Sequence, residues 1–218
     1  MKANSERVIG KNFRLLGGQP LFMWILKTLQ SVDVIDKIVI NTDARSIINK
    51  FDLKDMNKVI IKDRPKEICG DLVSMNKIIE NDLNDFQSDL YLMTHTTNPF
   101  LKSETIKNAI SFFIKDMSLN NSDSLFSVNK VQERFFNKDA IPINHDLDNL
   151  IRTQDLDPWY KENSNLYLFS KDSFMDSANR IGRNAVMFPM DTYESLDIDN
   201  EDDWNFAEVI ATKNFRKS

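Results

Sequence analysis

The chain has 218 residues, 41% of them hydrophobic, which suffices for one mixed domain with a substantial core but not for two full ones. Its net charge of -5 argues against a nucleic-acid-binding surface, because phosphate backbones are held by a basic face. A single cysteine, Cys69, excludes an internal disulfide, and no apolar run reaches the roughly 18 residues of a membrane span. We therefore expect one cytoplasmic domain over residues 1–218, with no nucleic-acid or membrane partner.

Short runs rich in apolar and β-branched residues alternate with segments in which apolar residues recur at helical spacing. Strands are predicted at 37–41, 58–61, 89–93, 125–130, 165–169 and 185–190. Helices are predicted at 20–29, 44–51, 74–83, 103–117 and 201–212. This alternation predicts an α/β, Rossmann-like fold with a mainly parallel sheet and helices on both faces.

Two segments break the alternation. Residues 131–160 are rich in Asn and Asp and poor in apolar runs, so we expect an excursion from the sheet, either a flexible loop or an arm toward a partner subunit. At the start, Met1 leads directly into loop-like sequence, whereas an α/β nucleotide-binding domain usually opens with an apolar strand before its phosphate loop. The fold then lacks a central strand, or the start codon has been assigned too late.

The segment 2–12 (KANSERVIGKN) brings together Lys2, Arg7, Lys11 and one glycine. A triphosphate requires backbone N–H groups from a tight loop, together with cations that offset its charge. The alternative is a solvated, frayed N-terminus, since the segment matches neither of the two common glycine-rich phosphate motifs.

Two aspartates near the C-terminus form a candidate metal site. In the extended segment 196–199 (LDID), Asp197 and Asp199 project to one side and Ile198 to the other. Mg²⁺ favours oxygen ligands and takes one or two carboxylates, with water and phosphate oxygens completing its shell. From this segment alone, an acidic turn that caps the final helix is the stronger interpretation.

Arg64 precedes Pro65 at the end of a predicted strand, where its planar guanidinium could be held against the edge of a cytosine ring. Ser74, with Asp71, opens the next predicted helix, so N-capping is an alternative to nucleotide binding there. His95 follows the strand 89–93, and the carboxyl ends of strands are where open sheets bind ligands. A lone histidine without a second ligand is poor evidence for a metal site.

Arg152 is a candidate for binding a carboxylate, because its fork donates two parallel hydrogen bonds to a planar acceptor. The alternative is a surface arginine that pairs with Asp155 or Asp157.

Several blocks in chain order resemble the acylneuraminate cytidylyltransferases (CMP-sialic acid synthetases), whose relatives activate legionaminic, pseudaminic and Kdo-type sugars. These blocks are 5–21 (SERVIGKNFRLLGGQPL), 64–74 (RPKEICGDLVS), 95–99 (HTTNP), 152–169 (RTQDLDPWYKENSNLYLF) and 195–203 (SLDIDNEDD).

The resemblance implies the nucleotide-diphospho-sugar transferase type of fold, with 131–160 as a protruding dimerisation arm and a first strand missing before Met1. It implies transfer of CMP from CTP to the anomeric hydroxyl of a sialic-acid-like nonulosonic acid, with release of pyrophosphate. Mg²⁺ would be the cofactor, and the arm would carry Arg152 into the site of the other subunit of a homodimer.

The resemblance also assigns site residues. The catalytic residues would be Lys11, Asp197 and Asp199, of which the two aspartates would bind the metal. The nucleotide contacts would be Lys2, Ser5, Arg7, Lys11, Asn12, Arg64 and Ser74. The sugar contacts would be His95, Thr97, Arg152, Gln154, Asn163 and Tyr167.

Three points stay open. Tyr167 lies in an apolar predicted strand and could equally belong to the core. The acceptor could be Kdo, legionaminic or pseudaminic acid, which these motifs do not separate. The chain could also be a degenerate nucleotide-binding dimer module without turnover.

Overall fold

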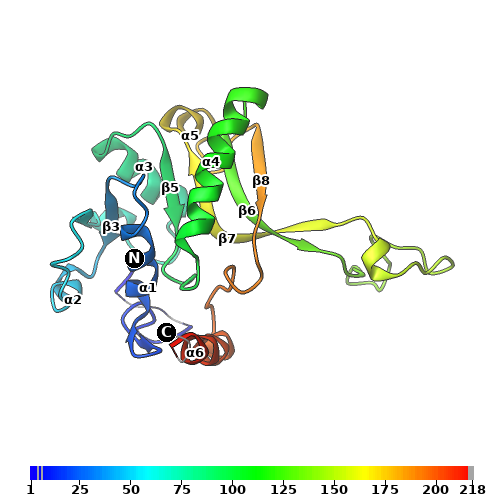
Figure 1. The fold of residues 1–218 in the computed structure, drawn as a ribbon, viewed down its shortest axis with the longest axis horizontal. Coiled ribbons are helices and arrows are strands. Elements are labelled where there is room, and N and C mark those ends of the chain that lie inside the picture. Colours follow the sequence, from blue (N-terminus) through cyan, green and yellow to red (C-terminus); the bar gives the residue numbers. More distant parts are fainter. Residues whose placement is uncertain (4, 6, 216–218) are drawn as a thin grey trace.

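The computed structural model describes residues 1–3, 5 and 7–215 (Figure 1). Its helices are α1 (Leu21–Gln30), α2 (Arg45–Ile48), α3 (Met75–Asp85), α4 (Ser103–Asn120), α5 (Lys171–Ser177) and α6 (Glu201–Phe215), with single 3-10 turns η1 (Lys66–Ile68) and η2 (Thr153–Asp155). Its strands are β1 (Leu15–Leu16), β2 (Gln19–Pro20), β3 (Ile38–Thr42), β4 (Val59–Asp63), β5 (Tyr91–Thr94), β6 (Ser124–Val131), β7 (Trp159–Phe169) and β8 (Ala185–Pro189).

The predicted strands and helices are confirmed, with shifted ends. The largest differences are α2, which has four residues, and β7, which begins six residues before the predicted strand. The helix α5 was not predicted, because its seven residues bury only Phe174 and so carry no clear apolar period. Ser170 starts this helix by accepting a hydrogen bond from the Ser173 amide.

The sheet is mixed rather than mainly parallel, which corrects the prediction. Strands β5, β7, β6 and β8 form one four-stranded sheet in that order, and β3 and β4 form a separate parallel pair. The β6–β8 pairing is parallel, whereas β7 runs antiparallel to both β5 and β6. The reason is that β7 is the return strand of a long ribbon with β6, and an alternating pattern does not reveal strand direction.

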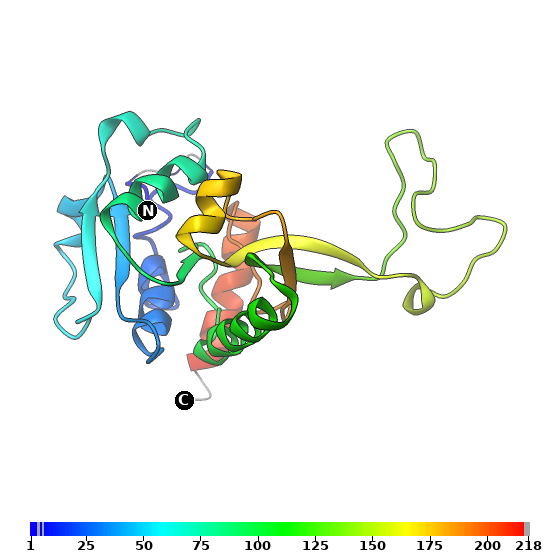
Figure 2. The same ribbon diagram turned by 90° about the horizontal axis from the view of Figure 1, so that it is seen from above.

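Helices cover both faces of the sheet, as predicted. Along β7, Leu166 and Leu168 pack into a core with α1 and α4, whereas Tyr167 and Phe169 pack into a core with α3 and α5. Figure 2 shows α4 on one side of β6 and β7 and α5 on the other. This alternation follows from the period of two along a strand.

A third core joins the two ends of the chain. Val8 and Leu16 near the N-terminus are buried with Ile198 and with Trp204 of α6. The loop that precedes α1 is thereby fixed against the segment that precedes α6.

An arm projects from the body of the molecule (Figure 1). It consists of the outer part of the β6–β7 ribbon and of residues 132–158, which agrees with the predicted excursion at 131–160. The two ends of the segment 132–158 are joined by hydrogen bonds from Gln132 to the Leu156 carbonyl oxygen and from Arg134 to the Ile151 carbonyl oxygen. Within the described ranges, none of the helices combines the length and apolar character that a membrane span requires.

Candidate functional site

The basic segment at the N-terminus forms a tight turn. The amide of Lys11 bonds to the Val8 carbonyl oxygen, and the amides of Phe13 and Arg14 both bond to the Gly10 carbonyl oxygen. Gly10 has φ of +62°, in the left-handed region that glycine adopts without strain. Because Val8 is fully buried, the turn has a fixed position, and Lys11 points from it toward the C-terminal segment.

Lys11 and the two aspartates come together. The Lys11 Nζ donates to the Ile198 carbonyl oxygen at 2.5 Å and lies 3.8 Å from Asp199 Oδ1, which Arg7 also contacts at 2.7 Å. Burial lowers the pKa of Lys11, and the negative charges of Asp199 and Asp197 oppose that shift. Burial raises the pKa of Asp197, opposed in part by the Thr97 hydroxyl.

The aspartate pair fits a hard divalent cation. Asp197 Oδ1 is buried and has no hydrogen-bond partner, and such an orphaned carboxylate oxygen is costly unless something binds it. The described residues contain no group of three acidic, His or Cys side chains that could hold a metal alone. Two carboxylates suit Mg²⁺, which fills its other positions with water and phosphate oxygens.

Arg64 is held rigidly at the carboxyl end of β4. Its Nε donates to Asn41 Oδ1 at 2.8 Å and its Nη2 to the Asn41 carbonyl oxygen at 3.0 Å, and the side chain is buried. Asn41 lies on β3 opposite Lys62 of β4. The parallel pairing of the two strands therefore places Asn41 within reach of Arg64. No local pattern around Asn41 predicts this contact, because it depends on which strands are neighbours.

Of the other predicted nucleotide contacts, Lys2, Ser5 and Asn12 line one cavity, whereas Ser74 is not in its lining. Lys2 pairs with Asp71 at 2.5 Å, and its carbonyl oxygen accepts from Asn12 at 2.8 Å. Ser5 lines the cavity described below, and Ser74 N-caps α3 by accepting from the Lys77 amide at 3.4 Å. Ser74 therefore has the capping contact that the sequence offered as its alternative role.

His95 and Thr97 follow β5 at the centre of the site. Burial lowers the pKa of His95 to about 4, and the positive charges of Arg180, the N-terminus and Lys11 act in the same direction. His95 is therefore neutral at pH 7 and suited to hydrogen bonding. The Thr97 carbonyl oxygen accepts from the Ile198 amide at 2.9 Å, which ties the end of β5 to the aspartate segment.

Within one chain, the predicted sugar contacts do not all converge. Arg152 and Gln154 lie on the arm, away from the body (Figure 1). Arg152 pairs with Asp155 at 2.6 Å, which is the alternative that the sequence left open. Asn163 is buried with an unpartnered Nδ2, and its Oδ1 accepts from the Ser127 hydroxyl at 2.6 Å.

Tyr167 belongs to the core. It has no exposed surface, its hydroxyl donates to Glu162, and the Arg180 guanidinium lies 4.1 Å from the centre of its ring. Burial and the Glu162 hydrogen bond raise the pKa of Tyr167 to about 12. Sequence reasoning missed Arg180, which lies in an irregular stretch after α5 and resembles any surface arginine when read alone.

A cavity of about 1220 Å³ lies beside the basic turn, and Arg7 and Lys11, which contact Asp199, are in its lining. At its polar end it is lined by Lys2, Ser5, Arg7, Lys11, Asn12, Arg64, His95 and Thr97. It continues as an apolar space between β3 and β5. The polar end brings four cations and neutral hydrogen-bonding groups together beside two carboxylates, as binding a polyanion with a metal requires.

The chain belongs to the cytidylyltransferase family, whose profile matches residues 1–211, and these proteins are nucleotidyltransferase enzymes. It is 25% identical over 226 residues to CMP-N,N'-diacetyllegionaminic acid synthase of Legionella pneumophila, covering 98% of this chain and 94% of that protein. It is 23% identical to N-acylneuraminate cytidylyltransferase of Streptococcus agalactiae serotype V, covering 96% of this chain and 51% of that protein.

Solved structures show the same fold. CMP:2-keto-3-deoxy-manno-octonic acid synthetase complexed with CTP superposes with a TM-score of 0.68 at 9% identity, over 98% of this chain and 96% of that one. The 4-diphosphocytidyl-2C-methyl-D-erythritol synthase of Anaerococcus prevotii gives 0.62 at 14% identity, over 96% of this chain and 92% of that one. The fold is therefore an α/β fold of the nucleotidyltransferase type.

Proposed function

We propose that this enzyme transfers CMP from CTP to the anomeric hydroxyl of a nonulosonic acid of the sialic acid type, with release of pyrophosphate. The observation that carries the proposal is the convergence of Asp197 and Asp199 on Lys11, which lines the cavity. Several relatives are named for CMP transfer to acylneuraminic, legionaminic or pseudaminic acids, which supports this substrate class.

In the proposed reaction, the sugar hydroxyl attacks the α-phosphorus of CTP in line, and the bond to pyrophosphate breaks. Lys2, Arg7 and Lys11 hold the triphosphate and offset its charge, and Arg64 binds the cytosine edge. Phosphoryl transfer depends mainly on positioning and charge stabilisation, which a rigid basic turn supplies. The neutral His95 donates a hydrogen bond to the sugar or accepts one from it.

We also propose that Asp197 and Asp199 hold Mg²⁺. The cation would lower the charge on the reacting phosphoryl group and favour deprotonation of the attacking hydroxyl. Arg7 and Lys11 contact Asp199 and partly neutralise its charge. These two cations would then turn from Asp199 to the phosphates when metal and CTP bind together.

The arm is proposed to form a homodimer with shared sites. Its exposed apolar side chains include Phe136, Ile141, Ile143, Leu147 and Leu150. Burying such residues against a second copy would offset their exposure to water. Arg152 would then exchange its exposed contact with Asp155 for the carboxylate of the sugar in the partner's site.

The test is to incubate the protein with CTP, Mg²⁺ and each member of a panel of nonulosonic and ulosonic acids. Pyrophosphate release and the mass of the CMP-sugar are measured. Formation of a CMP-sugar with one or more acids supports the proposal and identifies the acceptor. CTP binding by calorimetry without pyrophosphate release from any acid would instead indicate a nucleotide-binding module. The cytoplasmic location expected from the sequence stays a prediction.

A further inference from the structure

A buried carboxylate, that of Glu194, binds the N-terminus of a helix that is distant in the sequence. Glu194 lies between β8 and α6, and its side chain is 7% exposed. Its Oε2 accepts from the Lys102 amide at 3.1 Å and from the Thr105 hydroxyl at 2.6 Å. Its Oε1 accepts from the Lys102 ammonium at 2.8 Å. Both carboxylate oxygens are thus hydrogen-bonded, as a buried acidic group requires.

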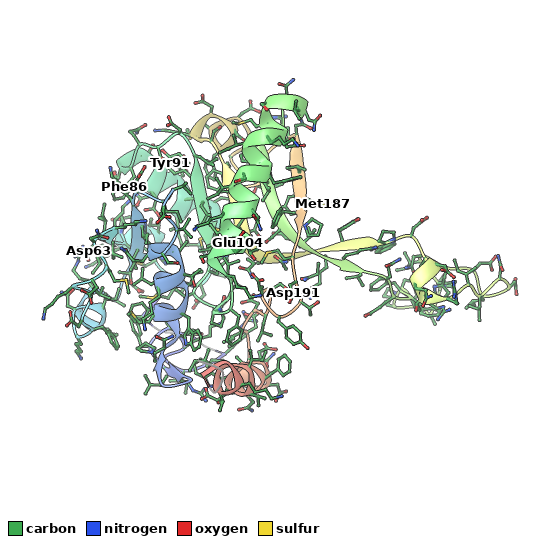
Figure 3. The ribbon with its side chains drawn as sticks, viewed as in Figure 1. Asp63, Phe86, Tyr91, Glu104, Met187 and Asp191 are labelled. Atoms are coloured by element: carbon green, nitrogen blue, oxygen red, sulfur yellow. The ribbon has the colours of Figure 1, made fainter. Side chains whose placement is uncertain are left out.

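The helix α4 depends on this contact at its first turn. Lys102 occupies the N-cap position, and its side chain makes no capping hydrogen bond to the described residues of that turn. The first amides of a helix lack partners within the helix and carry partial positive charge, so a carboxylate there is stabilising. Glu194 supplies it across 92 positions of sequence. Figure 3 labels Glu104 in the first turn of α4 and Asp191 in the loop that contains Glu194, on the two sides of this contact.

The same end of α4 follows directly on the loop that carries Thr97 and Asn98. The Thr97 carbonyl oxygen accepts from the Ile198 amide at 2.9 Å, and the fully buried Asn98 donates to the Leu196 carbonyl oxygen at 3.3 Å. The loop and helix start are therefore joined to the C-terminal segment at Glu194, Leu196 and Ile198, which are alternate residues. The two aspartates of the LDID segment occupy the positions after Leu196 and Ile198.

Strands of the sheet hold the same segment from another side. The Asn165 Nδ2 on β7 donates to the Glu194 carbonyl oxygen at 2.7 Å, and Asn165 is fully buried. The Asn129 Nδ2 on β6 donates to the Ser195 hydroxyl oxygen at 2.7 Å. Glu194 is thus fixed both at its side chain and at its backbone, by α4 and by β7.

The aspartates need their backbone to be held from elsewhere. Carboxylate oxygens that are to bind a metal must stay free of strong bonds to the protein, and Asp197 Oδ1 is buried without a hydrogen-bond partner among the described residues. Such ligands keep their geometry only when surrounding residues fix the chain that carries them. The contacts at Glu194, three positions before Asp197, meet this need.

We propose that Glu194 is a positioning residue for the metal-binding aspartates: by binding the N-terminus of α4, it fixes the segment that carries both aspartates against the loop that follows β5. Glu194 acts through the backbone and is not itself a ligand. This inference rests on the proposed binding of Mg²⁺ and CTP, and it does not depend on which sugar acid is the acceptor.

The experiment measures how strongly Mg²⁺ improves CTP binding. Glu194→Gln keeps the shape of the side chain but presents one acceptor oxygen to donors that now use two. The Kd of CTP is measured by calorimetry with saturating Mg²⁺ and with EDTA, without a sugar acid, so that no turnover occurs. In the wild type, Mg²⁺ should tighten CTP binding. In Glu194→Gln this gain should shrink by about tenfold, at the lower end of what losing an outer partner of a metal ligand costs. The Kd in EDTA should stay within about twofold of wild type, because the basic turn is unchanged.

A matched control separates positioning from stability. Asp123 also accepts hydrogen bonds from backbone amides, those of Arg183 and Asn184 at 2.8 and 3.0 Å. It precedes β6 and so lies at the end of the sheet away from the loop that follows β5, because β5 and β6 both run antiparallel to β7. Asp123→Asn should lower the Tm as Glu194→Gln does, but it should keep the full gain from Mg²⁺.

A second variant tests the same contact without changing a charge. Thr105→Val removes the hydroxyl that donates to Glu194, so the gain from Mg²⁺ should fall by about threefold, as expected for one hydrogen bond. The double variant should be no worse than Glu194→Gln alone, because both substitutions act on one contact. Thr105→Val keeps the test decisive if Glu194→Gln does not fold.

Three results would overturn the proposal. The first is an unchanged gain from Mg²⁺ in Glu194→Gln and Thr105→Val. The second is an equal loss of CTP affinity with and without Mg²⁺, and the third is a loss of the gain in Asp123→Asn as well, since Glu194 would then act through overall stability. If Mg²⁺ does not affect CTP binding by the wild type, the proposed metal site fails and this inference fails with it. A failure to form any CMP-sugar would appear only in the assay with sugar acids, so the two failures are distinguishable.

Discussion

The ammonium group of Lys11 donates a hydrogen bond to the backbone carbonyl oxygen of Ile198 at 2.5 Å, across 187 positions of sequence. Ile198 is buried in the same core as Val8, so packing fixes the backbone on both sides of this bond. Asp197 and Asp199 flank Ile198 and are thereby presented to the basic turn. A site for a charged substrate gains from such rigidity, because its charges need little rearrangement during the reaction.

The first prediction concerns Asp199. Asp199→Asn should leave the protein folded, because the carboxylate is 44% exposed and exposed ion pairs contribute at most about 1 kcal/mol. Turnover should fall by a factor of about 10² or more, as expected when a charge that stabilises the transition state is lost. Pyrophosphate release at saturating CTP and Mg²⁺ is the measurement. The control is Glu201→Gln, which breaks the ion pair between Glu201 of α6 and Arg14. Its turnover should stay within threefold of wild type. Near-normal turnover of Asp199→Asn would reject the metal assignment.

The alternation in the LDID segment predicted that two aspartates would share one side, whereas the composition of residues 2–12 left a phosphate loop and a frayed N-terminus as alternatives. The hydrogen bonds between Arg64 and Asn41 could not be predicted from a local pattern, because the two residues meet only through the pairing of β3 with β4. The antiparallel course of β7 was missed for a related reason, since the period of two is the same in both strand directions. Local sequence patterns thus identified the candidate site residues, whereas the pairing of strands far apart in the sequence determines which residues they contact.

The second prediction tests how Arg64 contributes. Its fork is fixed by two hydrogen bonds to Asn41, and a lysine keeps the charge without the planar geometry. Arg64→Lys should raise KM for CTP by about tenfold with a smaller change in kcat, because the contact would act in binding rather than at the reacting phosphorus. Arg45→Lys is the matched control, since Arg45 pairs with Asp63 on the surface. Equal effects of the two substitutions would show that Arg64 acts only through the fold.

The third prediction follows from His95, whose pKa falls from 6.5 to about 4 in the folded protein. Between these values the unfolded chain binds more protons, so the free energy of unfolding rises as the pH rises from 4 to 6.5 and is lost as the pH falls. The effect is at most about 3.5 kcal/mol, at about 1.4 kcal/mol for each pH unit. His95→Gln should flatten this part of the profile, measured by urea unfolding at pH 4.5 and 6.5. The Met1 amino group titrates in part of the same range, so the variant is compared with the parent at each pH. An unchanged slope would mean that His95 is solvated.

The fourth prediction tests the arm. Arg152 is exposed, and the contact described for its side chain is the ion pair with Asp155 on the same arm. Arg152→Ala should therefore not change the Tm by more than a few degrees.

If the arm completes the site of a second copy, Arg152→Ala alone should lose most of its activity at subsaturating sugar. In that case each site takes Asp199 from one subunit and Arg152 from the other, so the two substitutions affect different subunits of the same site. Refolding the two inactive variants together in equal amounts should restore about a quarter of the wild-type activity, because half of the dimers are mixed and each has one intact site. Sedimentation confirms that dimers have formed. No recovery from a dimeric mixture would mean that Arg152 serves the site of its own chain, and a monomer at all concentrations would reject the shared site.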